Sequence, residues 1–126
     1  MNQNLTKKHE IDTYFDGDVF RYFVFLRSYS RWLDSENRRE TWEEVVQRYI
    51  SFMAENLGTK LALDEYAEIH NAILHQEVMP SMRLMWSAGE PCRKNNIAAF
   101  NCSYVAIESL KDFADIVVIL SNGCGL

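Results

Sequence analysis

The spacing of apolar positions predicts a helix over residues 41–58. Thr41 and Glu44 have the spacing of a capping box, in which each side chain accepts a hydrogen bond from the other residue's backbone N–H. Apolar residues then recur every three or four positions, which places them on one helical face. They are Trp42, Val45, Val46, Tyr49, Ile50 and Met53. Gly58 can adopt the left-handed conformation that ends many helices. We expect this helix to serve as scaffold.

Two more helices follow from the same pattern. One begins at Asp64 and ends by Val78, because Pro80 restricts Met79 to extended conformations. Its expected inward side chains are Tyr66, Ile69, Ile73 and Leu74. The other begins at Ser109, which can cap it together with Asp112, and it ends at Gly123. Its expected buried side chains are Leu110, Phe113, Ile116, Val117 and Leu120.

The chain before residue 41 gives weaker signals. Residues 1–18 are polar and end in the turn-forming triplet 16–18, so we expect a loose arm. Residues 19–26 are rich in aromatic and β-branched residues, which suits a buried strand or a buried helix equally. Residues 27–40 mix arginine with aromatics and have no clear period. They are interpreted as a solvated connection held to the core by its aromatics, with direct ligand contact as the alternative.

Residues 101–107 alternate as a short strand should. Cys102, Tyr104 and Ala106 would share one face, which would put the Cys102 thiol beside residues that line a pocket or a core. A thiol at the start of a strand, shortly before a capped helix, lies where a catalytic cysteine could be placed. The alternative is that Cys102 is a small apolar filler, because free cysteine is among the most buried residue types.

Composition excludes several classes of function. The chain has 126 residues, a net charge of −5 and 48% hydrophobic residues. A negative balance argues against a dedicated nucleic-acid binder, which relies on clustered Lys and Arg. The first ten residues lack the apolar core of a signal peptide, and the run 116–120 is far shorter than the roughly 20 residues that span a bilayer. We therefore expect a soluble, cytoplasmic protein with neither nucleic-acid nor membrane partners.

The cysteines fit neither a disulfide framework nor a metal site. They number three and lie far apart, at positions 92, 102 and 124, and a reducing compartment would keep them as thiols. No C-x-x-C pair is present. His70 and His75 are five apart, where a shared ligand would need a spacing of four. We expect no metal, and His70 and His75 are interpreted as surface or hydrogen-bonded histidines.

Five segments in the same order resemble the N-terminal part of adenosylcobalamin-dependent ribonucleotide reductases, above all the monomeric ribonucleoside-triphosphate reductases of class II. They are residues 27–33, 39–46, 80–89, 101–107 and 123–126. The resemblance spans roughly residues 20–126. The class it implies is α/β. The chain would hold an N-terminal helical region plus the first strand and helix of the ten-stranded α/β barrel of these enzymes, a barrel left incomplete here.

After the flexible N-terminal arm expected over residues 1–18, the resemblance implies a mainly helical region over 19–78 and the start of the catalytic barrel over 79–126. These enzymes replace the ribose 2′-hydroxyl with hydrogen by thiyl-radical chemistry. Cys102 matches the first of the two cysteines that donate electrons and become a disulfide. Such a pair delivers two electrons without a metal. The second donor, the thiyl-forming cysteine and the adenosylcobalamin site belong to family segments absent from these residues.

Other positions match the family more loosely. Asn101 and Gly123 match residues that hold the substrate's ribose and phosphates, and a glycine lets backbone N–H groups approach oxygen atoms closely. Ser81 and Arg83 lie in a segment that lines the same site, with phosphate contact or a scaffold ion pair as the alternatives for Arg83. Glu108 and Ser109 lie at the end of the third helix that would face a dNTP effector.

Two cysteines depart from the family pattern. Cys124 stands in the glycine turn where the family has glycine or an apolar residue, and Cys92 matches no known role. Either could pair with Cys102 only if the fold brought the two Cα atoms to about 5.5 Å.

The resemblance predicts an N-terminal fragment that is inactive alone. Its implied partners are a ribonucleoside triphosphate, a dNTP effector, a thioredoxin-type reductant and a complementary C-terminal reductase chain. The fragment would be one half of a split enzyme or an interrupted gene product. The alternative is a non-catalytic helical interaction module, or a remnant, in which Cys102 is inert.

Overall fold

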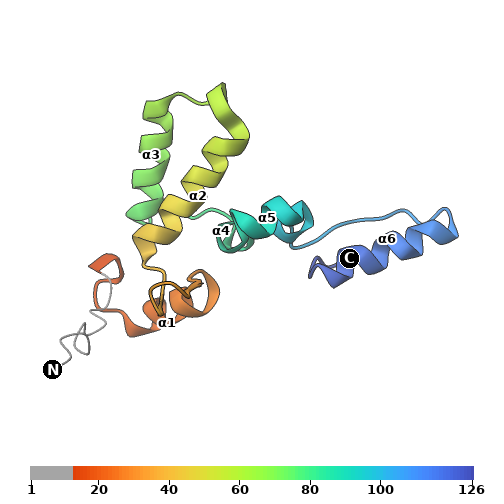
Figure 1. Cartoon of the computed structure of the whole chain (residues 1–126), viewed down its shortest axis with the longest axis horizontal. Helices are drawn as coiled ribbons and strands as arrows, with labels where there is room; N and C mark the ends of the chain where they lie inside the picture. Colours follow the sequence, from red (N-terminus) through yellow and green to blue (C-terminus); the bar gives the residue numbers. More distant parts are fainter. Residues whose placement is uncertain (1–12) are drawn as a thin grey trace.

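The computed structural model describes residues 13–126, which are mostly helical with one two-stranded antiparallel sheet. Helices α2 and α3 stand side by side, α1 lies near the start of α2, and α4, α5 and α6 extend away to one side (Figure 1). The elements are η1 (Thr13–Phe15), α1 (Val19–Ser28), β1 (Trp32–Leu33), β2 (Arg38–Arg39), α2 (Trp42–Leu57), η2 (Gly58–Lys60), α3 (Leu63–Leu74), α4 (Met82–Ser87), α5 (Glu90–Lys94), η3 (Asn96–Ala99) and α6 (Leu110–Ser121). None of the described helices combines the length and apolar character needed to cross a membrane.

The segment left open between strand and helix forms α1. Asp18 caps it, since its Oδ1 accepts hydrogen bonds from the backbone N–H groups of Phe20, at 2.9 Å, and Arg21, at 3.0 Å. The loose arm expected over residues 1–18 lies largely outside the described residues. Within it, however, Phe15 is only 4% exposed and belongs to the core. Residues 13–18 are therefore part of the folded body.

Helix α2 confirms the predicted capping box. The backbone N–H of Thr41 donates to Glu44 Oε2 at 2.7 Å, and the backbone N–H of Glu44 donates to Thr41 Oγ1 at 3.3 Å. Most of its predicted apolar face is buried, and Tyr49 and Met53 at its edges are half-buried. The buried members are Trp42, Val45, Val46 and Ile50.

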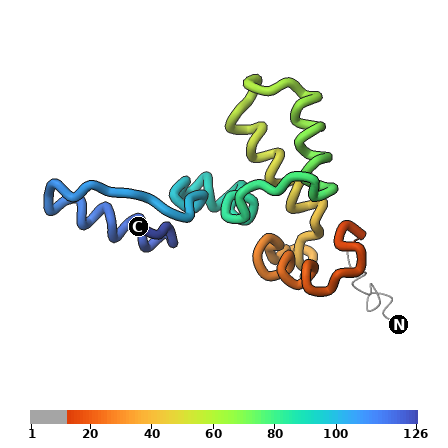
Figure 2. Tube along the Cα trace, turned by 180° about the vertical axis from the view of Figure 1, so that it is seen from behind, coloured from red at the N-terminus to blue at the C-terminus, as the bar shows by residue number. Residues whose placement is uncertain are grey.

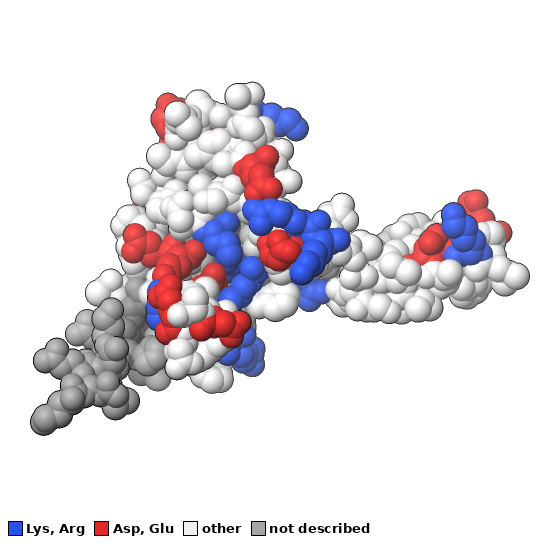
Figure 3. Space-filling model, viewed as in Figure 1, with Lys and Arg blue, Asp and Glu red and all other residues white. Residues whose placement is uncertain are grey.

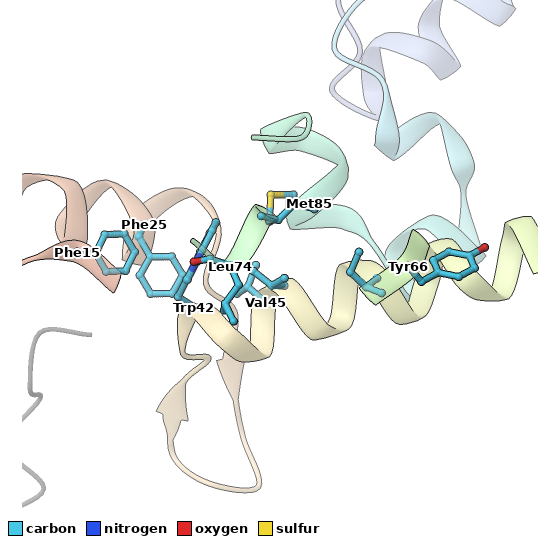
Figure 4. Close-up of a cluster of buried hydrophobic side chains, with 10 residues drawn as sticks. Phe15, Phe25, Trp42, Val45, Tyr66, Leu74 and Met85 are labelled. Carbon is cyan, nitrogen blue, oxygen red and sulfur yellow. The ribbon is translucent and has the colours of Figure 1, made fainter. Parts of the chain in front are cut away.

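The core is centred on Trp42 (Figure 4). The Phe15 and Phe25 rings stack with centroids 5.2 Å apart, and Phe25 meets the Trp42 ring edge-on at 5.8 Å. Such arrangements stabilise aromatic clusters by about 0.5–1.5 kcal/mol per pair beyond burial. Trp42 Nε1 donates to the backbone oxygen of Leu74 at 2.9 Å, which joins α2 to the end of α3. Met85 of α4 closes the same cluster.

Helix α3 begins one residue earlier than expected and ends well before Pro80. Tyr66, Ile73 and Leu74 are buried as predicted, but Ile69 is 38% exposed, so its predicted inward position was wrong. Glu65 accepts a hydrogen bond from the backbone N–H of Ala62 at 2.7 Å and so satisfies a free donor at the helix start.

The last quarter of the chain differs most from expectation. The strand predicted over residues 101–107 forms only an isolated parallel bridge, between Cys102 and Gly125, and the rest of that segment is extended without a partner strand among the described residues. Helix α6 has the predicted limits, but none of its residues is buried, and Leu110 is 87% exposed. Its predicted burial was wrong because the helix lies along an arm away from the core (Figure 2).

Candidate functional site

Cys102 lies at the meeting point of the extended segment and the glycine turn. The backbone N–H of Gly125 donates to the Asn101 oxygen, and that of Ser103 donates to the Gly125 oxygen, both at 2.7 Å. The alternation predicted for this segment is present only as far as residue 106: Ser103 and Val105 are half-buried, but Ile107 is 56% exposed. Cys102, Tyr104 and Ala106, however, are on the exposed side, so the expectation that they line a pocket or core was wrong. The Cys102 thiol is therefore open to reagents.

The other two cysteines are buried. Cys124 is 2% exposed and Cys92 is 7% exposed. Because side chains alternate along extended backbone, and Cys102 is bridged to Gly125, Cys124 next to Gly125 points to the opposite side of the bridge. All three cysteines are free thiols in this structure.

Cys92 has a packing role that the sequence did not reveal. Its Sγ donates to Ser87 Oγ at 3.2 Å, and Ser87 Oγ in turn donates to the backbone oxygen of Arg83 at 2.6 Å. Ser87 itself is fully buried. This short chain of hydrogen bonds ties α5 to α4.

Arg83 occupies the space between the two segments that meet at Cys102. Its Nε donates to the Ala98 oxygen at 3.0 Å, and its Nη2 donates to the oxygens of Gly123, at 2.8 Å, and Asn122, at 3.2 Å. With the residues that the structure describes, Arg83 forms no scaffold ion pair of the kind left open by the sequence, and its hydrogen-bond partners are backbone carbonyls. Gly123 has a φ of +75°, and a Cβ there would lie 2.6 Å from Arg83 Nη2.

The remaining predicted residues lie at two helix starts. Ser81 caps α4, with its Oγ accepting from the backbone N–H of Leu84 at 3.4 Å. Glu108 and Ser109 lie at the start of α6, where the Asp112 carboxylate accepts from their backbone N–H groups at 2.8 and 2.6 Å. These hydrogen bonds lower the pKa of Asp112. The structure thus brings Asn101, Cys102, Gly123 and Arg83 together and leaves Glu108 and Ser109 at the far end of α6.

A partly buried ionic cluster of Arg31, Glu40 and Arg48 supports α4 from the side of residues 13–74, which we call the helical body. Arg48 Nη1 donates to the Met85 oxygen at 2.7 Å, and Arg31 Nε donates to the Trp86 oxygen at 2.7 Å. Both arginines also reach the Ala88 oxygen. The pKa of Arg31 is lowered by burial and by the nearby charge of Arg48, which Glu40 partly offsets.

This cluster was missed because its members lie far apart in sequence. It makes residues 27–40 more than a solvated connection, since Ser30 and Glu40 are buried. Lys and Arg gather with acidic residues over the region where α2 meets α4 and α5, whereas the arm carrying α6 shows charge chiefly at its outer end (Figure 3). Positive charge near the last carbonyls of a helix is favourable, so the cluster holds the C-terminal end of α4.

Two hollows on the described residues are too small to enclose adenosylcobalamin. Two cavities of about 240 and 270 Å³ are present, one beside Phe15 and Trp42 and one between Ile50 and Tyr66. Both are below the roughly 300–1,000 Å³ that encloses a drug-sized ligand, and adenosylcobalamin is larger than such ligands. Within residues 13–126 no group of three or more His, Cys, Asp and Glu residues could hold a metal ion.

Comparisons with known proteins identify the family. The family model of the ribonucleotide reductase alpha domain matches residues 2–90, which include Ser81 and Arg83 but not Cys102. Adenosylcobalamin-dependent ribonucleoside-triphosphate reductases of Lactobacillus helveticus (29% identical over 111 residues, 79% of this chain) and Lactobacillus acidophilus (30% over 112 residues, 79%) are similar to it. That of Lactobacillus leichmannii is 30% identical over 101 residues, or 71% of this chain.

These matches cover 15% of the length of the first two relatives and 14% of the third. No solved structure matches the chain. Because the family model covers well over half of the 126 residues, the chain belongs to the ribonucleotide reductase alpha domain family.

Proposed function

We propose that this chain forms the amino-terminal part of an adenosylcobalamin-dependent enzyme that reduces ribonucleoside triphosphates to 2′-deoxyribonucleotides, and that Cys102 is one of its two electron-donating thiols. One observation carries the assignment of Cys102. It is the exposed cysteine of the three, and it lies beside the glycine turn, whereas Cys92 and Cys124 are buried. A thiol that must meet a substrate and then a reductant has to be accessible.

The proposed step balances as a two-electron reduction. The ribose C2′–O bond breaks and a C2′–H bond forms, while two thiols lose two electrons and two protons and become a disulfide. The hydroxyl leaves as water. The second thiol, the thiyl radical that activates the ribose and the adenosylcobalamin that generates it are placed in parts of the enzyme beyond these 126 residues. A thioredoxin-type protein would reduce the disulfide again, for which an exposed Cys102 is suited.

Asn101, Gly123, Ser81 and Arg83 are proposed to hold the substrate. Arg83 Nη1 makes no hydrogen bond to any residue of the described part of the chain, so it remains available to a phosphate oxygen. It lies 3.7 Å from the position of a Cβ on Gly123, at the edge of the turn. Ser81 at the start of α4 is two residues away from Arg83.

Glu108 and Ser109 are proposed to face the dNTP effector at the start of α6. Their backbone N–H groups already bind Asp112, so the Ser109 hydroxyl and the Glu108 side chain are the groups left for a ligand. The Ser109 hydroxyl can do so by exchanging its 3.1 Å bond to Asp112. The domain limits 19–78 and 79–126 follow the same proposal, with the second region completing its barrel through a C-terminal chain.

Reconstitution tests the proposal. The chain is mixed with a polypeptide that comprises the remainder of one of the similar reductases, together with adenosylcobalamin, a ribonucleoside triphosphate and a thioredoxin system. We expect dNTP formation that neither polypeptide gives alone. Cys102→Ser should lower it to background, whereas Cys92→Ser, a buried control, should retain it. A folded complex without turnover, or one with full activity after Cys102→Ser, would contradict the proposal.

A non-catalytic interaction module is the second candidate. The exposed apolar side chains of α6, including Phe113 at 52% and Val117 at 61%, favour it, because such surfaces usually contact another protein. This candidate predicts a complex whose formation and function are insensitive to Cys102→Ser. Turnover of the reconstituted enzyme that depends on Cys102 would favour the reductase over the interaction module.

A further inference from the structure

We propose that Arg83 is a positioning residue that sets where Cys102 lies relative to the glycine turn. The inference rests on the proposed function for its catalytic meaning, but its structural content stands on the geometry alone. One planar guanidinium binds both segments that meet at Cys102. Through Ala98 it holds the chain that leads to Cys102, and through Asn122 and Gly123 it holds the turn.

The guanidinium suits this task because its donors are fixed in one plane. A rigid fork loses little freedom per hydrogen bond, and bonds from a charged donor are stronger than neutral ones. Ala98 lies three residues before Asn101, and Gly123 lies two residues before Gly125. Arg83 therefore fixes the two segments just upstream of the two backbone hydrogen bonds, of 2.7 Å each, that flank Cys102.

The bridge at Cys102 needs such support. Even a two-stranded hairpin is marginal in water without further packing, and no other strand pairs with residues 101–107 in the described part of the chain. Apart from Arg83, the side chains of Asn95 and Asn122 also connect the segments, with Asn95 Nδ2 2.5 Å from Asn122 Oδ1. The hydrogen bonds from Arg83 have a charged donor, whereas the one between the two asparagines joins neutral amides.

Gly123 completes the arrangement from the other side. Its φ of +75° favours glycine. A Cβ at position 123 would lie 2.6 Å from Arg83 Nη2, which is too close, so the absence of a side chain makes room for the guanidinium. A side chain at position 123 would displace the guanidinium. Arg83→Gln and Gly123→Ala should consequently have the same effect on Cys102 by different routes.

The inference is tested by measuring how fast the cysteine thiols are labelled and how fast the backbone amides exchange hydrogen. Iodoacetamide labelling of the 126-residue chain is followed residue by residue by mass spectrometry, and hydrogen exchange is followed at the Ser103 and Gly125 amides. In the wild type, Cys102 should react quickly and Cys124 slowly. Arg83→Gln should raise the Cys124 labelling rate and both exchange rates about ten-fold or more, the scale of losing one charge-assisted hydrogen bond. Arg83→Lys should give an intermediate result, because an ammonium cannot reproduce the fork.

Controls separate local loosening from general unfolding. Arg93→Gln removes an arginine from an exposed ion pair with Glu55 and should leave all rates within about two-fold. Amides of Val45 and Val46 in the core should stay protected in every variant. If Arg83→Gln unfolds the chain, Gly123→Ala gives the answer instead. Wild-type labelling and exchange in a folded Arg83→Gln or Gly123→Ala variant would overturn the inference, whether or not reconstitution succeeds.

Discussion

Glu40 and Arg48 form a two-point ion pair beneath α4, with Arg48 Nε 2.7 Å from Glu40 Oε1 and Arg48 Nη2 2.9 Å from Glu40 Oε2. The Glu40 side chain is only 6% exposed and that of Arg48 17%. Glu40 Oε2 also accepts the backbone N–H of Arg31 at 3.0 Å. The Glu40 carboxylate thus compensates the charge of Arg48 and anchors the backbone of Arg31, so one acidic side chain connects the two arginines that bind the end of α4.

Glu40→Gln should destabilise the helical body by about 3 kcal/mol, because removing one member of a buried pair leaves the other charge uncompensated. Urea unfolding followed by far-ultraviolet circular dichroism measures the change. The matched control is Glu68→Gln, an exposed glutamate of α3, which should change stability by less than about 0.5 kcal/mol. Equal effects of the two substitutions would show that the pair does not stabilise α4.

Phe15→Ala should cost about 3–4 kcal/mol, because it removes a buried ring that stacks on Phe25. Phe20→Ala is the matched control, since the Phe20 side chain is 73% exposed and should matter by less than about 0.5 kcal/mol. The same urea unfolding experiment compares the two. A small effect at Phe15 would mean that residues before α1 do not belong to the folded body.

Glu44 should make stability depend on pH below neutrality. Hydrogen bonds from Arg38, at 2.6 and 2.7 Å, lower its pKa to about 2 from an ordinary 4.5. A depressed carboxyl pKa stabilises the fold above the unfolded pKa, and this contribution is lost as pH falls from about 4.5 towards 2. Because Glu44 is partly exposed, the contribution should be below about 1 kcal/mol.

The measurement is the difference in unfolding free energy between wild type and Glu44→Gln at pH 6 and at pH 2.5. We expect the difference to shrink at the lower pH. Glu43→Gln, in the same helical turn but without an arginine partner in the described residues, should show a smaller change with pH. A pH-independent difference for Glu44→Gln would contradict the stated cause.

Val117→Lys should leave the helical body intact and weaken assembly with a complementary reductase chain. Val117 is 61% exposed on α6, so a lysine costs the isolated chain little. A charge buried in an apolar interface, by contrast, should lower affinity at least about ten-fold. Asp115→Lys places the same group on another exposed position of α6 and should retain more affinity. Titration calorimetry measures the affinity of each variant for the complementary chain. Equal affinities of Val117→Lys and Asp115→Lys would contradict the prediction.

Local chemistry explains what the sequence could predict. The capping box of Thr41 and Glu44 acts over three residues, so its helix followed from the sequence with little context. The limits of α6 followed likewise from Ser109, Asp112 and Gly123. The ambiguity at residues 19–26 was resolved by Asp18, whose capping role could have been read as a helix signal.

Long-range contacts explain what the sequence could not predict. Whether the apolar side of α6 is buried depends on what packs against it, and the periodicity contains no such information. The hydrogen-bond partners of Arg83 could not be predicted, because they lie 15 and 40 residues further along the chain. The Arg31, Glu40 and Arg48 cluster brings together α2, the chain before it and the end of α4. No short motif specifies such a set.

The separation of the α6 arm from the core affects how the protein's unfolding must be observed. The sequence has three tryptophans, Trp32, Trp42 and Trp86, and all precede the extended segment that leads to α6. Tryptophan fluorescence, excited selectively at the red edge of the absorption band, therefore has no reporter within residues 101–126. A fluorescence melt can display one sharp transition while the arm has already frayed. A fluorophore attached at Cys102 would make that second event visible.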